Sequence, residues 1–477
     1  MKTFSLGPLS TPKLENVSIR FIPGVWKDDL NTTIKHICET EFVSASLKKL
    51  EISGMSNVSE IWCSQVPTGS FSKLEELIIA HCGKLRKLFS PSMARRLVHL
   101  RKLTIRSCPM LEEVVVKEEE AEEGSRMNEI MFPQLEELII DNCGKLRNLF
   151  SPSMARGLVH LRKLRISKCP MLEEVVVKEE EAEEGSRMNE IMFPQLEELI
   201  IDNCGKLRNL FSPSMARGLV HLRKLRISKC PMLEEVVVKE EEAEEGSRMN
   251  EIMFPQLEEL IIDNCGKLRN LFSPSMARGL VHLRKLRISK CPMLEEVVVK
   301  EEEAEEGSRM NEIMFPQLEE LIINNCGKLR NLFSPSMARG LVHLRKLIIA
   351  DCPMLEEVVV KEEEAEGGSR MNEIMFPQLK TLILGALLKL RSFFPVKHAL
   401  ELPSLHEVTL YICPEMKNFS LGPLSTPKLE NVYPLDNPAV CKDDLNNTIR
   451  HLHETEGPRW RAQLESTSKE AEATDHI

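Results

Sequence analysis

The sequence lacks the features that mark an exported or membrane-spanning chain. Its N-terminus, MKTFSLGPLSTPKLENV, has no apolar stretch of the kind that a signal peptide needs. No run of about 18 apolar residues occurs anywhere in the chain. We therefore expect a soluble, cytoplasmic protein, in which glycosylation triplets such as Asn16-Val17-Ser18 stay unmodified.

The chain also lacks an excess of positive charge. It has 63 Lys and Arg residues against 73 Asp and Glu residues, which gives a net charge of -10. This balance argues against a general binder of nucleic acid or of anionic membranes, although local patches could differ. We expect the partners to be proteins.

Closely spaced cysteine pairs are missing as well. Zinc sites of the common kind need pairs such as C-x2-C, and the sequence has none. The spacing of most cysteines instead predicts small buried thiols at one repeated position, in a reducing compartment and without metal. Ten of the 14 cysteines fall at alternating gaps of 26 and 35 residues: Cys82, Cys108, Cys143, Cys169, Cys204, Cys230, Cys265, Cys291, Cys326 and Cys352.

No catalytic constellation can be assembled from the other residues. Gly144-Lys145-Leu146 is similar to the end of a phosphate-binding loop, but it lacks the Ser or Thr that would hold Mg²⁺ and the earlier glycine. His160 recurs only every 61 residues, which is too wide for a shared metal ion. Paired glutamates are plentiful, but no cleft can be inferred around them. We predict that the protein is not an enzyme and has no cofactor.

Repetition is what the sequence has in abundance. Within one unit, LEELIIDNCGKLRNL and LRKLRISKCPMLEEV share the pattern L-x-x-L-x-I-x-x-C-x-x-L-x-x-L/V. This is the leucine-rich-repeat pattern, with cysteine at a position that takes Asn or Cys. Six phenylalanines open successive units at intervals of 61 residues: Phe71, Phe132, Phe193, Phe254, Phe315 and Phe376.

This pattern predicts an α/β fold, a leucine-rich-repeat solenoid of stacked turns. The alternating L-x-I segment is a short strand with one apolar side, so the stacked turns should form a parallel β-sheet on the concave face of a curved horseshoe. FSPSMARGL predicts a short helix on the returning side, with Ser151 as N-cap and Pro152 at the first helical position. A charge at Leu138 or Ile166, on the apolar side of the strands, should locally unstack the array.

We divide the chain into a solenoid at residues 1–456 and a tail. Irregular repeats at 1–70 precede double repeats at 71–375, and divergent repeats at 376–456 follow, which gives about fifteen strands. Residues 457–477 are polar, lack periodicity and predict a disordered tail. Residues 1–41 match 416–456 at 29 of 41 positions, so the chain begins inside a repeat. This start favours a truncated gene product or an incomplete gene.

An acidic segment follows the second strand of each double repeat. VVVKEEEAEEGSRMNEIMF, residues 114–132, is the first copy, and it predicts a long loop between strands. Two interpretations stay open: a solvated loop, which a Glu-rich composition with Gly and Ser favours, or an acidic ridge that attracts a basic partner. The charged parts of the five copies begin at Lys117, Lys178, Lys239, Lys300 and Lys361.

The outward side of the predicted sheet is the candidate protein-binding face. Parallel register would set acidic residues against basic ones, in exposed pairs worth about 0.2–1 kcal/mol each. The units differ mostly at or beside the strands, while the acidic segment stays nearly fixed. Such variation is typical of a recognition surface, although a ladder of self-satisfied charges would have the same residues. The candidates are Glu137, Ile139, Asp141, Lys163, Arg165, Ser167, Thr104, Asn324 and Ile348.

The repeats resemble a known family. FPQLEELIIDNCGKLRNLFSPSMARGLVHLRKLRISKCPMLEEVV and CPEMKNFSLGPLSTPKLENV are similar to the C-terminal leucine-rich-repeat region of plant coiled-coil nucleotide-binding leucine-rich-repeat (NLR) disease-resistance proteins. The resemblance implies a cytoplasmic receptor part that senses a pathogen effector or a guarded host protein and restrains a nucleotide-binding module. This sequence has no phosphate-binding loop, so nucleotide switching is not carried over. An adaptor for another complex, such as a ubiquitin ligase, and a non-functional truncated duplicate remain alternatives.

Overall fold

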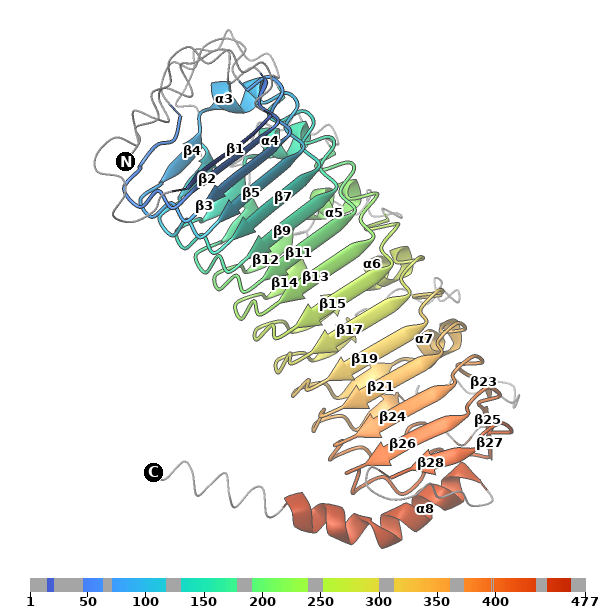
Figure 1. Cartoon of the computed structure of the whole chain (residues 1–477). Coiled ribbons are helices and arrows are strands. Elements are labelled where there is room, and N and C mark those ends of the chain that lie inside the picture. The colour runs from blue at the N-terminus through green and yellow to red at the C-terminus, as the bar shows by residue number, and fades with distance from the viewer. Residues whose placement is uncertain are drawn as a thin grey trace, which may run out of the picture. The chain divides into compact units, whose positions relative to one another are not determined.

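The computed structural model describes most of the chain, which forms two compact units, residues 1–222 and 223–477. Fifteen strands make one parallel sheet, and their order in it follows the chain (Figure 1). The described residues are 15–20, 46–62, 71–116, 130–177, 191–238, 252–299, 313–360, 373–395, 397, 399–434 and 444–464.

Each unit contributes a run of short strands to this sheet. Those of the first unit are β1 (Asn16–Arg20), β2 (Lys49–Ser53), β3 (Glu76–Ala80), β5 (Lys102–Arg106), β7 (Glu137–Asp141), β9 (Lys163–Ser167) and β11 (Glu198–Asp202). Those of the second are β13 (Lys224–Ser228), β15 (Glu259–Asp263), β17 (Lys285–Ser289), β19 (Glu320–Asn324), β21 (Lys346–Ala350), β24 (Thr381–Gly385), β26 (Glu407–Tyr411) and β28 (Asn431–Tyr433). The fold is the α/β leucine-rich-repeat solenoid that the sequence predicts, and the count of strands agrees with the prediction.

The L-x-I alternation builds the core as expected. In β7 the side chains of Leu138 and Ile140 are at most 1% exposed. They lie beside Leu164 and Ile166 of β9 in parallel register. Full burial of a large apolar side chain contributes roughly 1.5–3 kcal/mol, so each turn gains stability mainly from the turns beside it.

A short helix follows five of the sheet strands, as FSPSMARGL predicts. In α4 the Oγ of Ser151 accepts a hydrogen bond from the N–H of Met154 at 3.2 Å, and Pro152 occupies the first turn. The predicted cap is therefore confirmed, and the helix buries Met154 and Ala155 against the repeat. The five helices are α3 (Pro91–Arg96), α4 (Pro152–Gly157), α5 (Pro213–Gly218), α6 (Pro274–Gly279) and α7 (Pro335–Gly340).

Small parallel sheets away from the main sheet were not predicted, because their strands have only two or three residues and show no periodicity. In one of them Asn148 lies beside Glu174. The strands are β4 (Lys87–Phe89) with β6 (Glu113–Val115), β8 (Asn148–Phe150) with β10 (Glu174–Val176), β12 (Asn209–Phe211) with β14 (Glu235–Val237), β16 (Asn270–Phe272) with β18 (Glu296–Val298), β20 (Asn331–Phe333) with β22 (Glu357–Val359), and β23 (Glu373–Ile374) with β25 (Leu400–Glu401) and β27 (Leu424–Ser425).

The ten repeated cysteines lie in the turns after the strands from β3 to β21 of the main sheet. All ten of the predicted positions are buried thiols without a disulfide, as their spacing predicts. The Sγ of Cys169 donates a weak hydrogen bond to the carbonyl of Ser167, and Lys168 between them adopts a left-handed φ of 52°. The hydrogen bond that the Cys143 thiol donates to Cys169, together with burial, raises the pKa of Cys143, and the same bond lowers the pKa of Cys169. Burial raises the pKa of Cys413 to about 12. With raised pKa values, Cys143 and Cys413 stay neutral and serve packing.

A helix covers the end of the sheet after β28. Asp444 caps α8 (Leu445–Thr455), and the Oδ1 of Asn446 accepts hydrogen bonds from the N–H groups of Phe419 and Ser420 at 2.8 and 3.1 Å. Residues 457–464, which we expected to open a disordered tail, are instead helical. Trp460 is only 7% exposed, and its burial favours an ordered segment. The polar composition of the tail gave no sign of this contact.

Two predictions concern segments that this description does not reach. The acidic segments beginning at Lys117, Lys178, Lys239, Lys300 and Lys361, and residues 465–477 of the tail, lie outside the described residues. Among the described helices, none is long and apolar enough to cross a membrane. Within the same residues, no group of three or more His, Cys, Asp or Glu side chains is placed to hold a metal ion.

Candidate protein-binding face

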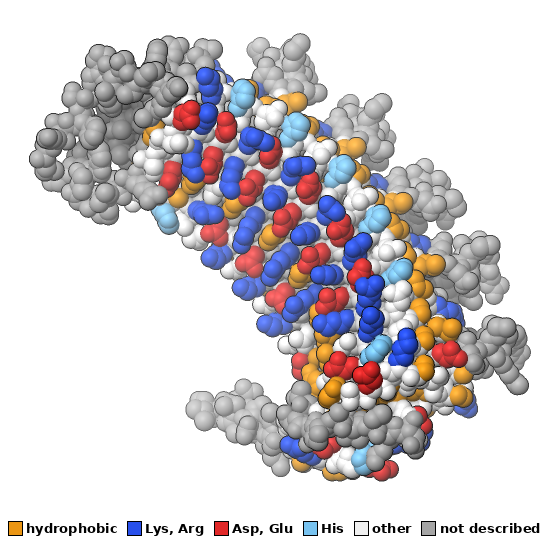
Figure 2. Space-filling model, turned by 45° about the vertical axis from the view of Figure 1, so that its right-hand side comes forward, with side chains coloured by type: hydrophobic (Ala, Val, Ile, Leu, Met, Phe, Trp, Pro, Cys, Tyr) orange, Lys and Arg blue, Asp and Glu red, His pale blue; other side chains and the backbone are white. Residues whose placement is uncertain are grey.

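The exposed face of the sheet consists of the outward residues of each strand, which are its first, third and fifth. β7 and β9 show the predicted register: Glu137 lies beside Lys163, and Ile139 lies beside Arg165. Lys163 and Arg165 are exposed, whereas the outward residues of β7 are half-buried. Figure 2 shows the result, an intimate mixture of acidic and basic side chains over the strands.

Neighbouring strands form ion pairs across this face. The Nζ of Lys102 lies 2.9 Å from the Oε2 of Glu137, and the Nζ of Lys49 lies 2.8 Å from the Oε2 of Glu76. These side chains remain 29–42% exposed, so each pair contributes at most about 1 kcal/mol. The predicted charge ladder is present, and it fixes register more than it stabilises.

Two of the candidate residues are less accessible than we expected. Thr104 is 3% exposed and Ser167 is 4% exposed. Their side chains are short and lie between longer ones, because Thr104 is flanked in register by Ile78 and Ile139. A partner could not contact these two residues without displacing their neighbours. The other candidates stay half-buried or exposed, namely Glu137, Ile139, Asp141, Lys163, Arg165, Asn324 and Ile348.

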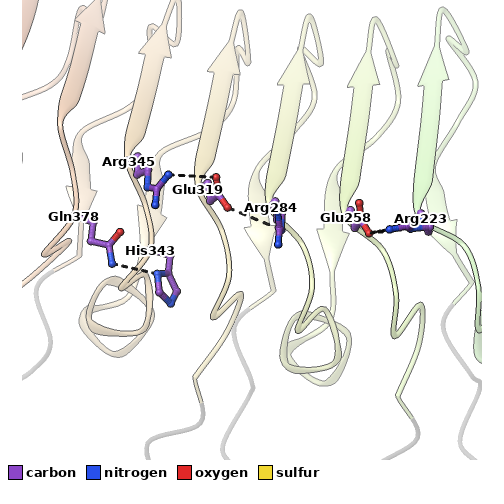
Figure 3. A network of polar contacts seen from close by, with 7 residues as sticks. All are labelled: Arg223, Glu258, Arg284, Glu319, His343, Arg345 and Gln378. Carbon is purple, nitrogen blue, oxygen red and sulfur yellow. Dashed lines mark hydrogen bonds and ion pairs between the residues drawn. The ribbon is translucent and has the colours of Figure 1, made fainter.

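A second ladder, which the sequence reasoning missed, runs along the residues that precede the strands. Arg101 Nη2 lies 2.6 Å from Glu136 Oε1, and this hydrogen bond raises the pKa of the arginine. Farther along, Arg223 donates to Glu258 through Nε at 2.8 Å and Nη2 at 2.5 Å (Figure 3). The signal was available, since the LEEL and LRKL segments each carry two charges in succession.

This second ladder changes in the divergent repeats. Lys380 takes the place that Glu319 holds one double repeat earlier. Without a glutamate ahead of it, Arg345 turns back to Glu319, at 3.9 Å, and that carboxylate also lies 3.9 Å from Arg284 (Figure 3). Beside it, the Nε2 of Gln378 lies 3.2 Å from the Nδ1 of His343. One carboxylate therefore serves two arginines here.

The third outward position changes as well. In the regular repeats isoleucine alternates with arginine, so Ile261 lies beside Arg287. From β19 onward the arginine is missing: Ile322, Ile348 and Ile383 lie next to one another in register. We call these three residues the isoleucine row, and all three are half-buried.

The fifth outward position beside this row carries small residues and a tyrosine. Ala350 and Gly385 are buried, and Tyr411 follows them in register. A Cβ at Gly385 would overlap the ring of Tyr411, so glycine lets that ring lie across β24. Burial, and secondarily the charge of Asp351, raises the pKa of Tyr411. Asn324 holds the same fifth position in β19, and its Oδ1 is buried without a hydrogen-bond partner.

The solved structures to which the chain is similar include leucine-rich-repeat proteins. The leucine-rich-repeat domain of the type III effector XopL is 23% identical with a TM-score of 0.38, and the match covers 58% of this chain and 77% of that one. A leucine-rich-repeat protein of Leptospira interrogans is 15% identical with a TM-score of 0.31, covering 87% of this chain and 100% of that one. The ectodomain of the Arabidopsis thaliana receptor kinase GASSHO1/SCHENGEN3 is 15% identical with a TM-score of 0.21, covering 82% and 56%.

A family model gives the more specific result. The model for RPS2-like plant disease resistance proteins, leucine-rich repeats, matches residues 26–109, 122–170, 183–231, 244–292 and 293–426. These segments make up well over half of the sequence and include the helices α3 to α7 and the turns that carry the ten repeated cysteines. The chain belongs to the family of RPS2-like leucine-rich repeats of plant disease resistance proteins.

Proposed function

We propose that this protein acts in plant defence as a recognition solenoid, which binds another protein through the exposed face of its sheet. The family match is the observation that carries the proposal. Leucine-rich repeats are protein-interaction scaffolds whose sheet face offers an extended binding surface. The partner we propose is a pathogen effector, a guarded host protein or a nucleotide-binding module, met in the cytoplasm and bound without catalysis or cofactor.

The proposed contacts fall on the side chains that a partner can reach. Lys163 and Arg165 are exposed, and they stand on one strand. Glu137, Ile139 and Asp141 of the strand beside them are half-buried and complete a surface of both charges. Asn324 and Ile348 extend the candidate set in the other unit, while Thr104 and Ser167 would support the surface from beneath.

A charge reversal on this face tests the proposal. The full chain is immobilised, and the proteins that it captures from plant extract are compared with those captured by the double variant Lys163→Glu with Arg165→Glu. Two altered contacts should cost about 1.4 kcal/mol or more together, which lowers recovery at least about tenfold. Equal capture of the same proteins by both chains would contradict recognition through this surface.

A matched control separates the face from net charge. Lys145→Glu with Arg147→Glu changes the charge equally, on exposed residues of the turn and segment after β7 and away from the sheet face. This variant should keep wild-type capture. The identity of the captured proteins tests the defence role separately, since proteins unconnected with effectors, guarded host proteins or nucleotide-binding modules would contradict that role alone.

A further inference from the structure

The isoleucine row is a break in a charged surface. In the regular repeats an arginine such as Arg287 separates one outward isoleucine from the next, because it lies between Ile261 and Ile322 in parallel register. At Ile322, Ile348 and Ile383 this separation is lost over three adjacent strands. Adjacent strands lie about 4.8 Å apart, so the three side chains form one continuous apolar strip.

The edge of this strip, at the strand starts, carries uncompensated positive charge. Lys380 is exposed and occupies a glutamate position, and no ion pair involves it among the residues that the structure describes. Next to it Arg345 has, within the described part of the chain, the distant carboxylate of Glu319 as its ion-pair partner, and Arg284 shares that carboxylate. In the earlier repeats the arginine at this position has a glutamate of its own, as Arg223 has Glu258.

The surroundings limit this surface to a few strands. On one side Tyr411 lies across Gly385 and closes the strip at the strand ends. Beyond Ile383 the row continues with Thr409, and the exposed Glu407 at the start of β26 ends the run of positive charge. An apolar strip with cations along one edge is what remains.

We propose that the isoleucine row, with Arg345 and Lys380 at its edge, binds a protein segment that presents a large apolar side chain next to a carboxylate. The inference rests on the proposed function, and it names the chemistry of the partner. The apolar group would cover the half-buried isoleucines, while the carboxylate would pair with Lys380 and give Arg345 the partner that Glu319 supplies only at 3.9 Å.

Peptide selection on the full chain tests this chemistry without knowing the natural partner. A random peptide display library is panned on the immobilised protein, and the selected peptides are measured against the wild type and three variants. Ile348→Arg and Lys380→Glu each restore the residue that the regular repeats carry at that position, Arg287 and Glu319, so both should fold. Ile261→Arg places the same arginine outside the row and serves as the control.

The selected peptides should share an aromatic or aliphatic residue beside Asp or Glu. Ile348→Arg should weaken their binding at least about tenfold, because it splits the strip, and Ile261→Arg should leave it unchanged. Lys380→Glu should weaken the binding of peptides that carry Asp or Glu. Replacing that acidic residue of the peptide by lysine should restore binding to this variant alone. A consensus without acid, or equal affinity for wild type and Ile348→Arg, would overturn the proposal.

Two further outcomes are also decisive. Wild-type self-association in sedimentation, abolished by Ile348→Arg, would show that a second copy covers the row and would overturn the proposed partner. If plant proteins are still captured through Lys163 and Arg165 while the selected peptides ignore the row, this inference fails and the proposed function stands. The reverse result, with peptides behaving as expected and capture insensitive at Lys163 and Arg165, contradicts recognition through those residues alone.

Discussion

The regular strands β13, β15 and β17 and the divergent strands β24, β26 and β28 of the second unit share a framework but not a surface. Leu384 in β24 is as fully buried as Ile288 in β17, at 0% exposed. Both strands have the same parallel register with their neighbours. The outward residues differ, since the third position is Arg287 in β17 and Ile383 in β24. Core and face can therefore change independently within one solenoid.

The energies explain this independence. A fully buried large side chain contributes roughly 1.5–3 kcal/mol, whereas an exposed ion pair contributes about 0.2–1 kcal/mol. Where Lys380 stands in place of a glutamate and Ile348 in place of an arginine, only surface charge interactions are lost. The inward leucines stay in place. The framework tolerates such replacement, which leaves the outward positions free to suit a partner.

The largest expected effect comes from placing a charge in the shared core. Ile288→Asp should lower the free energy of unfolding by more than about 4 kcal/mol, because a buried carboxylate has no partner there. Leu384→Asp should cost the same, since both regions have the same core. Urea denaturation followed by far-ultraviolet circular dichroism measures both variants.

The control for this comparison is Arg287→Asp, which puts the same charge on the outward side of β17. It should change stability by no more than about 0.5 kcal/mol. If Leu384→Asp behaved like this surface variant while Ile288→Asp did not, the divergent strands would not share the stacking energetics of the regular ones.

A medium effect is expected where the divergent face has its own packing. Gly385→Ala places a methyl group where the ring of Tyr411 lies, so the ring must move. We expect a loss of about 1–2 kcal/mol in stability, measured by urea denaturation. The regular repeats carry side chains at this position, such as Ala350 and Asp263, so no comparable conflict exists there.

A double-mutant cycle assigns this cost to the ring. In the Tyr411→Ala background, Gly385→Ala should cost nothing and could stabilise by about 0.5–1 kcal/mol, because alanine restricts the unfolded chain more than glycine does. An equal cost in both backgrounds would mean that the glycine is needed for another reason.

The framework was predictable because a single physical cause determines the residue type at each repeated position. The spacing of Leu138 and Ile140 gives a strand with one buried side, and Ser151 followed by Pro152 gives a capped helix start. The cysteine spacing also located the buried thiols correctly. Repetition helps, because a weak local signal that recurs every 61 residues becomes a reliable one.

The features that the sequence did not predict depend on contacts between side chains, which the repeat pattern does not encode. The pairing of Arg223 with Glu258 joins residues 35 apart, outside the strands on which the sequence reasoning concentrated. The burial of Thr104 depends on the size of its neighbours rather than on its own position. Of the candidate site, the outward register of Glu137 and Lys163 could be predicted, whereas the uncompensated edge at Lys380 needed the three-dimensional ladder.

A smaller effect on stability should distinguish the unshared pair of Arg223 and Glu258 from Glu319, which two arginines share. Glu258→Gln removes the negative charge that accepts hydrogen bonds of 2.5 and 2.8 Å from Arg223 and should cost about 0.5–1 kcal/mol after solvent screening. Glu319→Gln removes two contacts at 3.9 Å and should cost less than about 0.5 kcal/mol. Urea denaturation at low salt should resolve the difference, and about 1 M salt should abolish it. A larger cost at Glu319 would show that sharing strengthens its pairs.

The smallest expected effect is the titration of Tyr411, whose pKa is raised mainly by burial and then by Asp351. The chain has 2 tyrosines, so Tyr433→Phe leaves Tyr411 as the single phenol whose ultraviolet absorbance reports ionisation. The native midpoint should lie above the usual value of about 10 and should return to it in urea. Because the folded pKa is the higher one, the stability that Tyr411 contributes is complete below about pH 10 and falls as pH rises through the folded pKa.

Asp351→Asn should lower the native midpoint only partly, since burial is the larger cause. A native midpoint of about 10 or lower would mean that the Tyr411 ring is open to water and does not lie across Gly385.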